Sequence, residues 1–284
     1  MSVRVSSAEH SSARFTERRW RRRRRVFIAS ILLLVLVVGA GLYGLWRPSA
    51  RISRVTIYGA DQSLAKLATA EMAGSYLSIA PRDSTFLFPA RRIRTSILQT
   101  HTDIAAVSIF RNGLTGLSIK LDYRVPIARW CGLAPSDEVA EYCYLFDANG
   151  FIFSAASSGE GDVRSATSSP TVNNFTFYAP LAEDALEPLR ASIAHTEKLP
   201  AVFDFARGLA TLGSPVDRIV SRGDEIDLHL KSGTRVTYVL GREEDAFTAL
   251  MSGRENLNLA DGSLEYVDLR FPGKVYLKKR ELNN

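Results

Sequence analysis

Residues 26–46 read VFIASILLLVLVVGAGLYGLW, an uninterrupted run of twenty-one uncharged residues. As an α-helix this run would be about 31 Å long, enough to cross the hydrocarbon core of a bilayer. It therefore predicts a single transmembrane helix. A secretory signal peptide is the alternative, but the run is too long for one, and residues 45–48, LWRP, lack the small residues of a cleavage site.

The residues before this helix predict its orientation. Residues 1–25 contain nine arginines and two glutamates, out of 36 basic and 30 acidic residues in the whole chain. Short basic flanks stay in the cytoplasm. We therefore expect a single-pass protein of the cytoplasmic (inner) membrane, with residues 1–25 as a disordered cytoplasmic tail and residues 47–284 outside.

The charge distribution argues against a nucleic-acid partner. Residues 26–284 hold 27 basic and 28 acidic residues, so the high isoelectric point of the chain belongs to the tail alone. An arginine block beside a membrane helix is typical of a topology signal that rests on anionic headgroups. A nearly neutral outer portion has no long-range attraction for DNA or RNA.

The first outer segment, residues 50–124, is expected to fold in the order strand, helix, helix, strand, strand. Leu117, Ile119 and Leu121 alternate with polar residues, as in a half-buried strand. Asn112-Gly113 supplies the turn before that strand. The five expected elements are a strand at 51–58, a helix from Asp61 or Ser63 to Gly74, a helix at 89–99, and strands at 104–111 and 115–123.

The second outer segment, residues 125–279, predicts another α+β unit, followed by a tail at 280–284. Its Ser-rich and Gly-rich part, residues 154–174, predicts a surface loop. The remaining expected elements are strands at 175–179, 216–221, 225–230, 235–240, 264–269 and 274–279, and helices at 199–212 and 243–258. The predicted fold class is α+β: one transmembrane helix, a β-α-α-β-β domain, and a second domain built on an antiparallel sheet.

Cys131 and Cys143 are the two cysteines of the chain. Outside the membrane such a pair can oxidise, and closing this short loop would stabilise the fold by about 2 to 3 kcal/mol. Two free thiols are the alternative. A structural zinc ion needs four ligands, and no histidine or further cysteine lies nearby in sequence, so we expect no metal.

The sequence contains fragments of only one catalytic signature. Residues 63–66, SLAK, and 231–233, KSG, match parts of the penicillin-binding protein motifs, but the intervening S-x-N or Y-x-N element is missing. The acidic residues 243–245 open a predicted helix, where they complement its dipole. The histidines lie far apart in sequence, and His229 is expected to face solvent; the other three are His10, His101 and His195. We therefore expect no enzyme activity, cofactor or small-molecule substrate.

Four segments, in their order and spacing, resemble the FtsQ and DivIB family of bacterial cell division proteins. They are residues 123–130 (YRVPIARW), 144–153 (YLFDANGFIF), 230–241 (LKSGTRVTYVLG) and 266–271 (YVDLRF). The resemblance implies a POTRA domain at 50–124 and the family's β domain at 125–279. It also implies a divisome scaffold at the midcell septum that links early and late division proteins. The loop at 154–174 and the cysteine pair depart from the family pattern.

The same resemblance implies a partner-binding region at the C-terminal end. In the family this region recruits the small bitopic proteins FtsB and FtsL. Arg270, Phe271 and Gly273 match the family's terminal motif, and Val275, Tyr276 and Leu277 belong to the last strand, which is expected to have a free edge. The alternative explanation is that the lysines of this strand only prevent its edge from pairing with other chains. Tyr276→Pro is expected to abolish partner binding. A membrane-anchored POTRA protein that assists polypeptide export or assembly is the alternative function.

Overall fold

The structure is a computed structural model that describes residues 9–59, 63–133, 142–156, 171–255 and 257–281. The chain forms two compact units. Unit 1 comprises the chain up to Thr100 together with Ala106–Asp122, and unit 2 comprises His101–Ala105 and the chain from Tyr123 onward.

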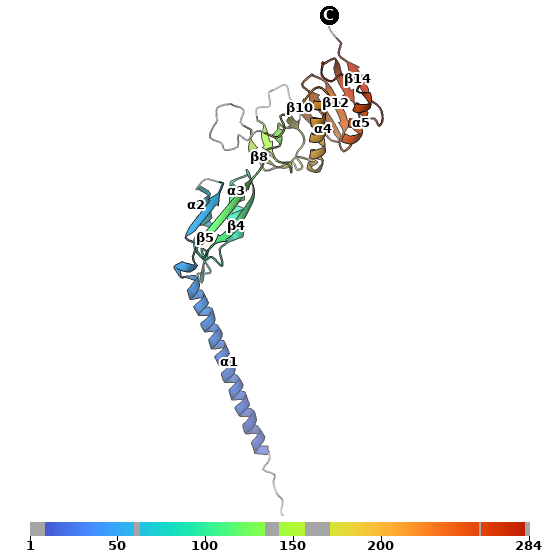
Figure 1. The fold of residues 1–284 in the computed structure, drawn as a ribbon. Helices are drawn as coiled ribbons and strands as arrows, with labels where there is room; N and C mark the ends of the chain where they lie inside the picture. The colour runs from blue at the N-terminus through green and yellow to red at the C-terminus, as the bar shows by residue number, and fades with distance from the viewer. Residues whose placement is uncertain (1–8, 60–62, 134–141, 157–170, 256, 282–284) are drawn as a thin grey trace, which may run out of the picture. The chain divides into compact units, whose positions relative to one another are not determined.

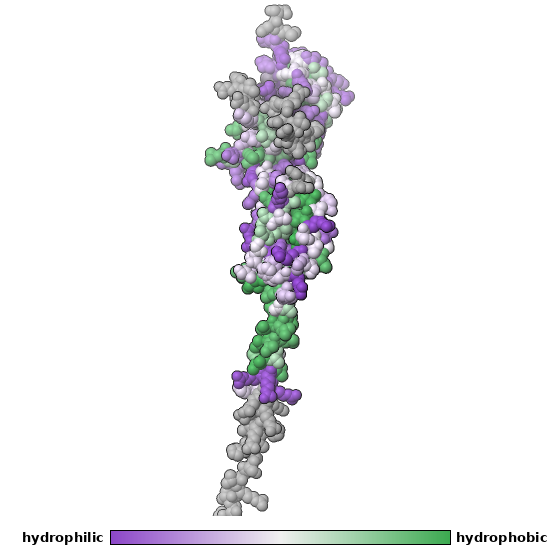
Figure 2. Space-filling model, turned by 90° about the vertical axis from the view of Figure 1, so that its left-hand side faces the viewer, coloured by the Kyte–Doolittle hydropathy of each residue, from purple (hydrophilic) through white to green (hydrophobic). Residues whose placement is uncertain are grey.

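A single long helix, α1 (Glu9–Leu45), begins the described chain (Figure 1). Its segment Arg22–Leu45 is long and apolar enough to cross a membrane, with a mean hydropathy of 2.7. None of this apolar window is buried against the rest of the protein. Figure 2 shows the resulting apolar band, with hydrophilic side chains at its N-terminal end. A helix of sufficient length and hydropathy is thus present where the membrane helix was predicted, and it ends one residue earlier than expected.

The basic tail differs from the expectation of disorder. Residues 9–25 continue α1 toward the N-terminus, and residues 1–8 lie outside the described part of the chain. Once the apolar segment has formed a helix, each further residue adds a backbone hydrogen bond without a new nucleation step. Arginine and alanine are also good helix formers. The expectation of disorder rested on composition and on the missing apolar periodicity, and neither accounts for this propagation.

Unit 1 places a three-stranded sheet against two helices. The sheet has the strand order β1-β5-β4, with β1 and β5 parallel. Its core joins Leu64 and Ala68 of α2, Ile93 and Ile97 of α3, and the alternating residues of β5. The elements are η1 (Pro48–Ala50), β1 (Arg54–Tyr58), α2 (Ser63–Glu71), β2 (Ser75–Tyr76), β3 (Ala80–Pro81), α3 (Ala90–Thr100), β4 (Ile104–Asn112) and β5 (Gly116–Tyr123). Apart from η1 and the small β2–β3 hairpin, their order is the predicted one.

Unit 2 is built on one nine-stranded sheet with the order β14-β13-β12-β11-β10-β9-β6-β7-β8. Helices α4 and α5 contribute buried side chains to a single apolar core on one face of this sheet (Figure 1). The elements are β6 (Ala128–Trp130), β7 (Tyr144–Phe146), β8 (Ile152–Ala155), β9 (Thr176–Tyr178), η2 (Thr196–Lys198), α4 (Leu199–Thr211), β10 (Val216–Arg222), β11 (Glu225–Leu230), β12 (Arg235–Val239), α5 (Glu243–Gly253), β13 (Leu264–Asp268) and β14 (Tyr276–Lys279).

The sheet of unit 2 is mixed, so the expectation of an antiparallel sheet was wrong. Strands β9 and β10 pair in parallel, and so do β12 and β13 and also β6 and β9. Helix α4 lies between the first two strands in sequence, and α5 lies between β12 and β13. A helical crossover returns the chain to its starting end, which makes the flanking strands parallel.

Two further expectations concern the segment between β6 and β9. Cys131 and Cys143 are joined in a disulfide. The predicted surface loop at 154–174 starts later than expected, because residues 154 and 155 still belong to β8. Most of that loop, residues 157–170, lies outside the described part of the chain.

Candidate partner-binding edge

Strand β14 forms one end of the nine-stranded sheet. Among the described residues its only neighbour in the sheet is β13, and all four residues of β14 are exposed. Leu277 pairs with the fully buried Val267, whereas Tyr276 pairs with Asp268. Because successive side chains of a strand point to opposite faces, Leu277 lies on the core face of the sheet and Tyr276 on the other face.

One hydrogen bond shows which backbone groups of β14 are directed outward. The Arg280 N–H donates to the Ser263 carbonyl oxygen, next to β13, at 2.8 Å. Successive N–H groups of an extended strand point alternately to either side in the plane of the sheet. The N–H groups of Lys278 and Tyr276 therefore point toward β13. Those of Leu277 and Lys279 point away from the sheet, where a partner strand could accept them.

The six residues predicted for partner binding lie together around this strand but differ in exposure. The rings of Phe271 and Tyr276 pack edge to face, with centroids 5.3 Å apart, and both residues are about half exposed. Gly273 has a φ of +66° in the turn between β13 and β14, and Val275 packs against the core of unit 2. Phe271, Tyr276 and Leu277 are therefore the exposed large apolar side chains among the six.

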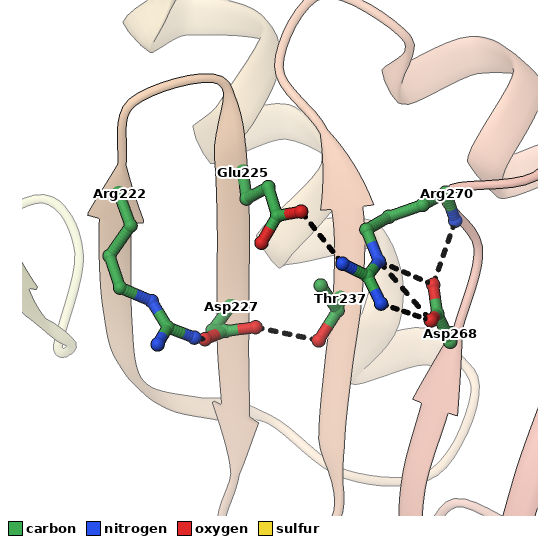
Figure 3. A network of polar contacts seen from close by, with 6 residues as sticks. All are labelled: Arg222, Glu225, Asp227, Thr237, Asp268 and Arg270. Atoms are coloured by element: carbon green, nitrogen blue, oxygen red, sulfur yellow. Dashed lines mark hydrogen bonds and ion pairs between the residues drawn. The ribbon is translucent and has the colours of Figure 1, made fainter.

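Arg270, by contrast, is held by carboxylates of its own unit (Figure 3). Its guanidinium makes ion pairs of 2.7 Å with Asp268 and with Glu225 of β11, and its backbone N–H donates to Asp268 at 3.0 Å. The side-chain hydrogen bond from Arg270 holds the pKa of Asp268 below its ordinary value, against the opposing effect of burial. Hydrogen bonds to Asp268 and then to Glu225 raise the pKa of Arg270. The role of Arg270 in this structure is to fix the chain where it leaves β13.

The polar contacts continue across the sheet from Arg270. Asp227, only 2% exposed, accepts a 2.6 Å hydrogen bond from the Thr237 hydroxyl and pairs with Arg222 (Figure 3). The strand register places Asp227, Thr237, Asp268 and Tyr276 in one row across β11 to β14. A buried carboxylate needs such partners, because an unpaired one is strongly unfavourable. The row thus runs from Tyr276 on the edge strand to the buried Asp227 in the interior of the sheet.

A groove lies beside the edge strand on its core face. It has a volume of about 530 Å³ and runs between α5 and the turn that precedes β14. Pro272, Gly273 and Val275 form one wall, and α5 residues such as Ala249 and Ser252 form the other. A partner strand added at β14 would find a recess here for a side chain on the same face as Leu277.

A second contact joins two of the sequence segments used for the family resemblance. Arg124, from the first segment, forms an ion pair with Asp147, from the second, and stacks over the Phe151 ring at 4.0 Å. Asp147 also accepts the backbone N–H groups of Asn149 and Phe151 at 2.9 and 3.1 Å. This pair was not among the expectations from the sequence. The Asp-x-Asn-Gly turn at 147–150 was the available signal, since aspartate at such a position caps its own turn.

The catalytic fragments have structural explanations. Ser63 begins α2 in unit 1, whereas Lys231, Ser232 and Gly233 lie in the turn between β11 and β12 of unit 2, where the Ser232 N–H donates to Ser214 Oγ. Glu243 at the start of α5 accepts the Gly241 N–H. Among the described residues, no group of three His, Cys, Asp or Glu side chains could hold a metal ion.

The expectation that His229 faces solvent is only partly met. The residue is half-buried on β11, between Arg218 of β10 and Arg235 of β12. Burial, followed by the charge of Arg218, lowers the pKa of His229. Both effects favour the neutral imidazole.

The comparisons with known proteins do not extend the picture. No protein-family model matches this chain, and a search of curated proteins gives no significant match. The resemblance to FtsQ and DivIB therefore stays a prediction, carried by the four sequence segments.

Proposed function

We propose that this chain is a non-enzymatic scaffold of bacterial cell division, similar to FtsQ and DivIB, that binds the outer domains of small bitopic partners by accepting a strand at β14. The observation that carries the proposal is the outer edge of β14, which pairs with no strand other than β13 in the described part of the chain; there the N–H groups of Leu277 and Lys279 point away from the sheet. Helix α1 tethers the two units to the cytoplasmic membrane, with the N-terminus in the cytoplasm and the units gathered at midcell.

Strand addition fits the chemistry of this edge. In such complexes, backbone hydrogen bonds supply affinity and the alternating side chains supply selectivity. Leu277 and the groove offer apolar contacts on one face, and the Phe271–Tyr276 ring pair offers them on the other. Lys278, paired with Glu265 at 2.7 Å, places charge beside the edge, which disfavours unspecific pairing.

Unit 1 supplies the second part of the proposal. Its strand, helix, helix, strand, strand order supports a POTRA domain, which would dock within the septal machinery. The proposed division of labour assigns docking to unit 1 and capture of FtsB-like and FtsL-like partners to unit 2.

Leu277→Pro tests the proposed edge. The substitution removes a backbone donor that points away from the sheet, and proline is tolerated at such edge positions. Loss of one main-chain hydrogen bond should weaken partner binding about tenfold, equivalent to roughly 1.4 kcal/mol. The measurement is co-purification of FtsB-like and FtsL-like proteins with the full chain from detergent extracts.

Leu277→Ala is the matched control, because it shortens the same side chain but keeps the N–H. It should bind more strongly than the proline variant. Tyr276→Pro is a less selective probe than the sequence suggested, since its N–H points toward β13 and its loss should also destabilise the β13–β14 hairpin. Partner recovery that is equal for Leu277→Pro and the unchanged protein would contradict strand addition at β14.

A further inference from the structure

The β2–β3 hairpin of unit 1 ends in a turn with an unusual sequence. Leu77 and Ser78 have φ values of +48° and +61°, and the Ile79 N–H donates to the Tyr76 carbonyl oxygen at 2.8 Å. Two successive residues with positive φ are typical of a type I′ turn, which favours asparagine and glycine. Leucine is unfavourable there, and such a conformation points to a functional reason for the residue.

The side chain of Leu77 projects into the surroundings of the protein. It is 90% exposed, and its neighbour Ile79 is 53% exposed. Four more large apolar side chains of unit 1 are exposed, and they are linked to this turn by closeness in sequence or by the contacts described below. They are Trp46, Phe86, Leu87 and Leu114. Figure 2 shows apolar side chains at the end of unit 1 that adjoins α1. These six residues are called the apolar rim.

Contacts within unit 1 place the apolar rim at the end of the membrane helix. The Trp46 indole N–H, one residue after α1, donates to the Ile79 carbonyl oxygen at 2.9 Å. Thr85 links the rim to the chain just beyond the helix, since its N–H donates to the Ala50 carbonyl oxygen and its hydroxyl to that of Leu114. Tryptophan at the end of an apolar span belongs to the membrane interface. The turn at Leu77 therefore lies at the level of the lipid headgroups when α1 spans a bilayer.

Basic side chains accompany the apolar rim. The Arg82 guanidinium lies over the Tyr76 ring at 5.4 Å, and that of Arg111 lies over the Phe86 ring at 5.8 Å. Arg47 follows directly after Trp46. Apolar tips flanked by arginine are characteristic of surfaces that enter the headgroup region of anionic membranes.

We propose that the β2–β3 turn, with Leu77 at its apex, inserts into the bilayer leaflet at the C-terminal end of α1 and holds unit 1 against the membrane surface. This inference rests on the placement of α1 in a membrane within the proposed function. The occupant of the apolar rim is lipid, because the rim is joined to the membrane span by the Trp46 contact and by only a few residues of chain.

Spin labels on single cysteines test the proposal in the full chain, reconstituted in nanodiscs of phosphatidylethanolamine and phosphatidylglycerol. The native cysteines are joined in a disulfide and do not react. Leu77→Cys carries the test label, and Val35→Cys within α1 is the lipid control. Tyr58→Cys, at the C-terminal end of β1, is the water control. We expect the accessibility of the label at position 77 to lie between the values at 35 and 58, with more oxygen and less of a water-soluble nickel complex reaching it than reach the label at 58.

The outcomes distinguish a failure of the proposed insertion from a failure of the proposed membrane anchor. A label at 77 that matches the one at 58, while 35 reports lipid, would overturn the insertion and leave the anchor in place. Water accessibility at 35 would overturn both. A second variant, Leu77→Asn with Ser78→Gly, supplies the preferred turn residues and should keep unit 1 folded. A spin label at Leu114→Cys is then measured with and without this double substitution. If Leu77 inserts, the substitution should lower the oxygen accessibility of the label at position 114; an unchanged accessibility would contradict the proposal.

Discussion

Arg124→Ala should lower the free energy of unfolding of unit 2 by about 3 kcal/mol, the lower end of the range for removing one partner of a buried ion pair. The side chain of Asp147 is only 8% exposed, so its charge cannot be fully hydrated once the guanidinium is gone. The variant also loses the stacking over Phe151 and the 3.1 Å hydrogen bond from Arg124 Nε to the Thr102 carbonyl oxygen. Urea unfolding of the full chain in detergent, followed by circular dichroism, measures the change.

A surface ion pair of the same unit provides the comparison. Arg242 pairs with Asp245 at 3.1 Å, but the Asp245 side chain is 71% exposed. Arg242→Ala should therefore cost no more than about 0.5 kcal/mol. Equal losses for the two arginine variants would show that the Arg124–Asp147 pair does not hold the two segments together.

Arg270→Ala should lower the stability of unit 2 by about 2 kcal/mol at pH 7, because it removes charge-assisted hydrogen bonds from a largely buried carboxylate. The loss should depend on pH. The pKa of Asp268 is lowered in the folded protein, so its contribution is complete above the ordinary aspartate value of about 4 and disappears as the pH falls through the lowered value. Unfolding measured at pH 7 and pH 3 should show a smaller difference between variant and unchanged protein in acid.

Asp268→Asn is the control for this titration. It removes the ionisable group while keeping the size of the side chain, so the stability of this variant should vary less between pH 7 and pH 3. An Arg270→Ala defect of the same size at both pH values would contradict the assignment of the lowered pKa to the Arg270–Asp268 contact.

Local patterns in the sequence predicted most elements of the fold. The apolar run at 26–46 required a helix of membrane length, and the alternation at Leu117, Ile119 and Leu121 required a strand with one buried face; these residues are 1%, 0% and 6% exposed. Both signals arise within a few residues of chain. The paired cysteines were likewise visible as an oxidisable pair, and the structure joins them.

Relations between distant segments were harder to predict. The pattern of apolar residues in β9 and β13 does not indicate that each strand is parallel to a neighbour. The strand direction depends on the crossovers through α4 and α5. The Arg124–Asp147 pair joins residues 23 positions apart. The direction of the Tyr276 N–H depends on the pairing of β14 with β13, so the sequence alone could not show that a proline at position 276 would also act on the β13–β14 hairpin.

The central claim is that the outward edge of β14 receives a partner strand at the division site. A photo-reactive amino acid at position 277, introduced into the full chain in dividing cells, tests it most directly; position 154 on β8, the opposite end of the sheet, is the control. The account predicts a covalent adduct with a small single-pass membrane protein from position 277 and none from 154. No adduct at 277, or the same adduct from both positions, would contradict it.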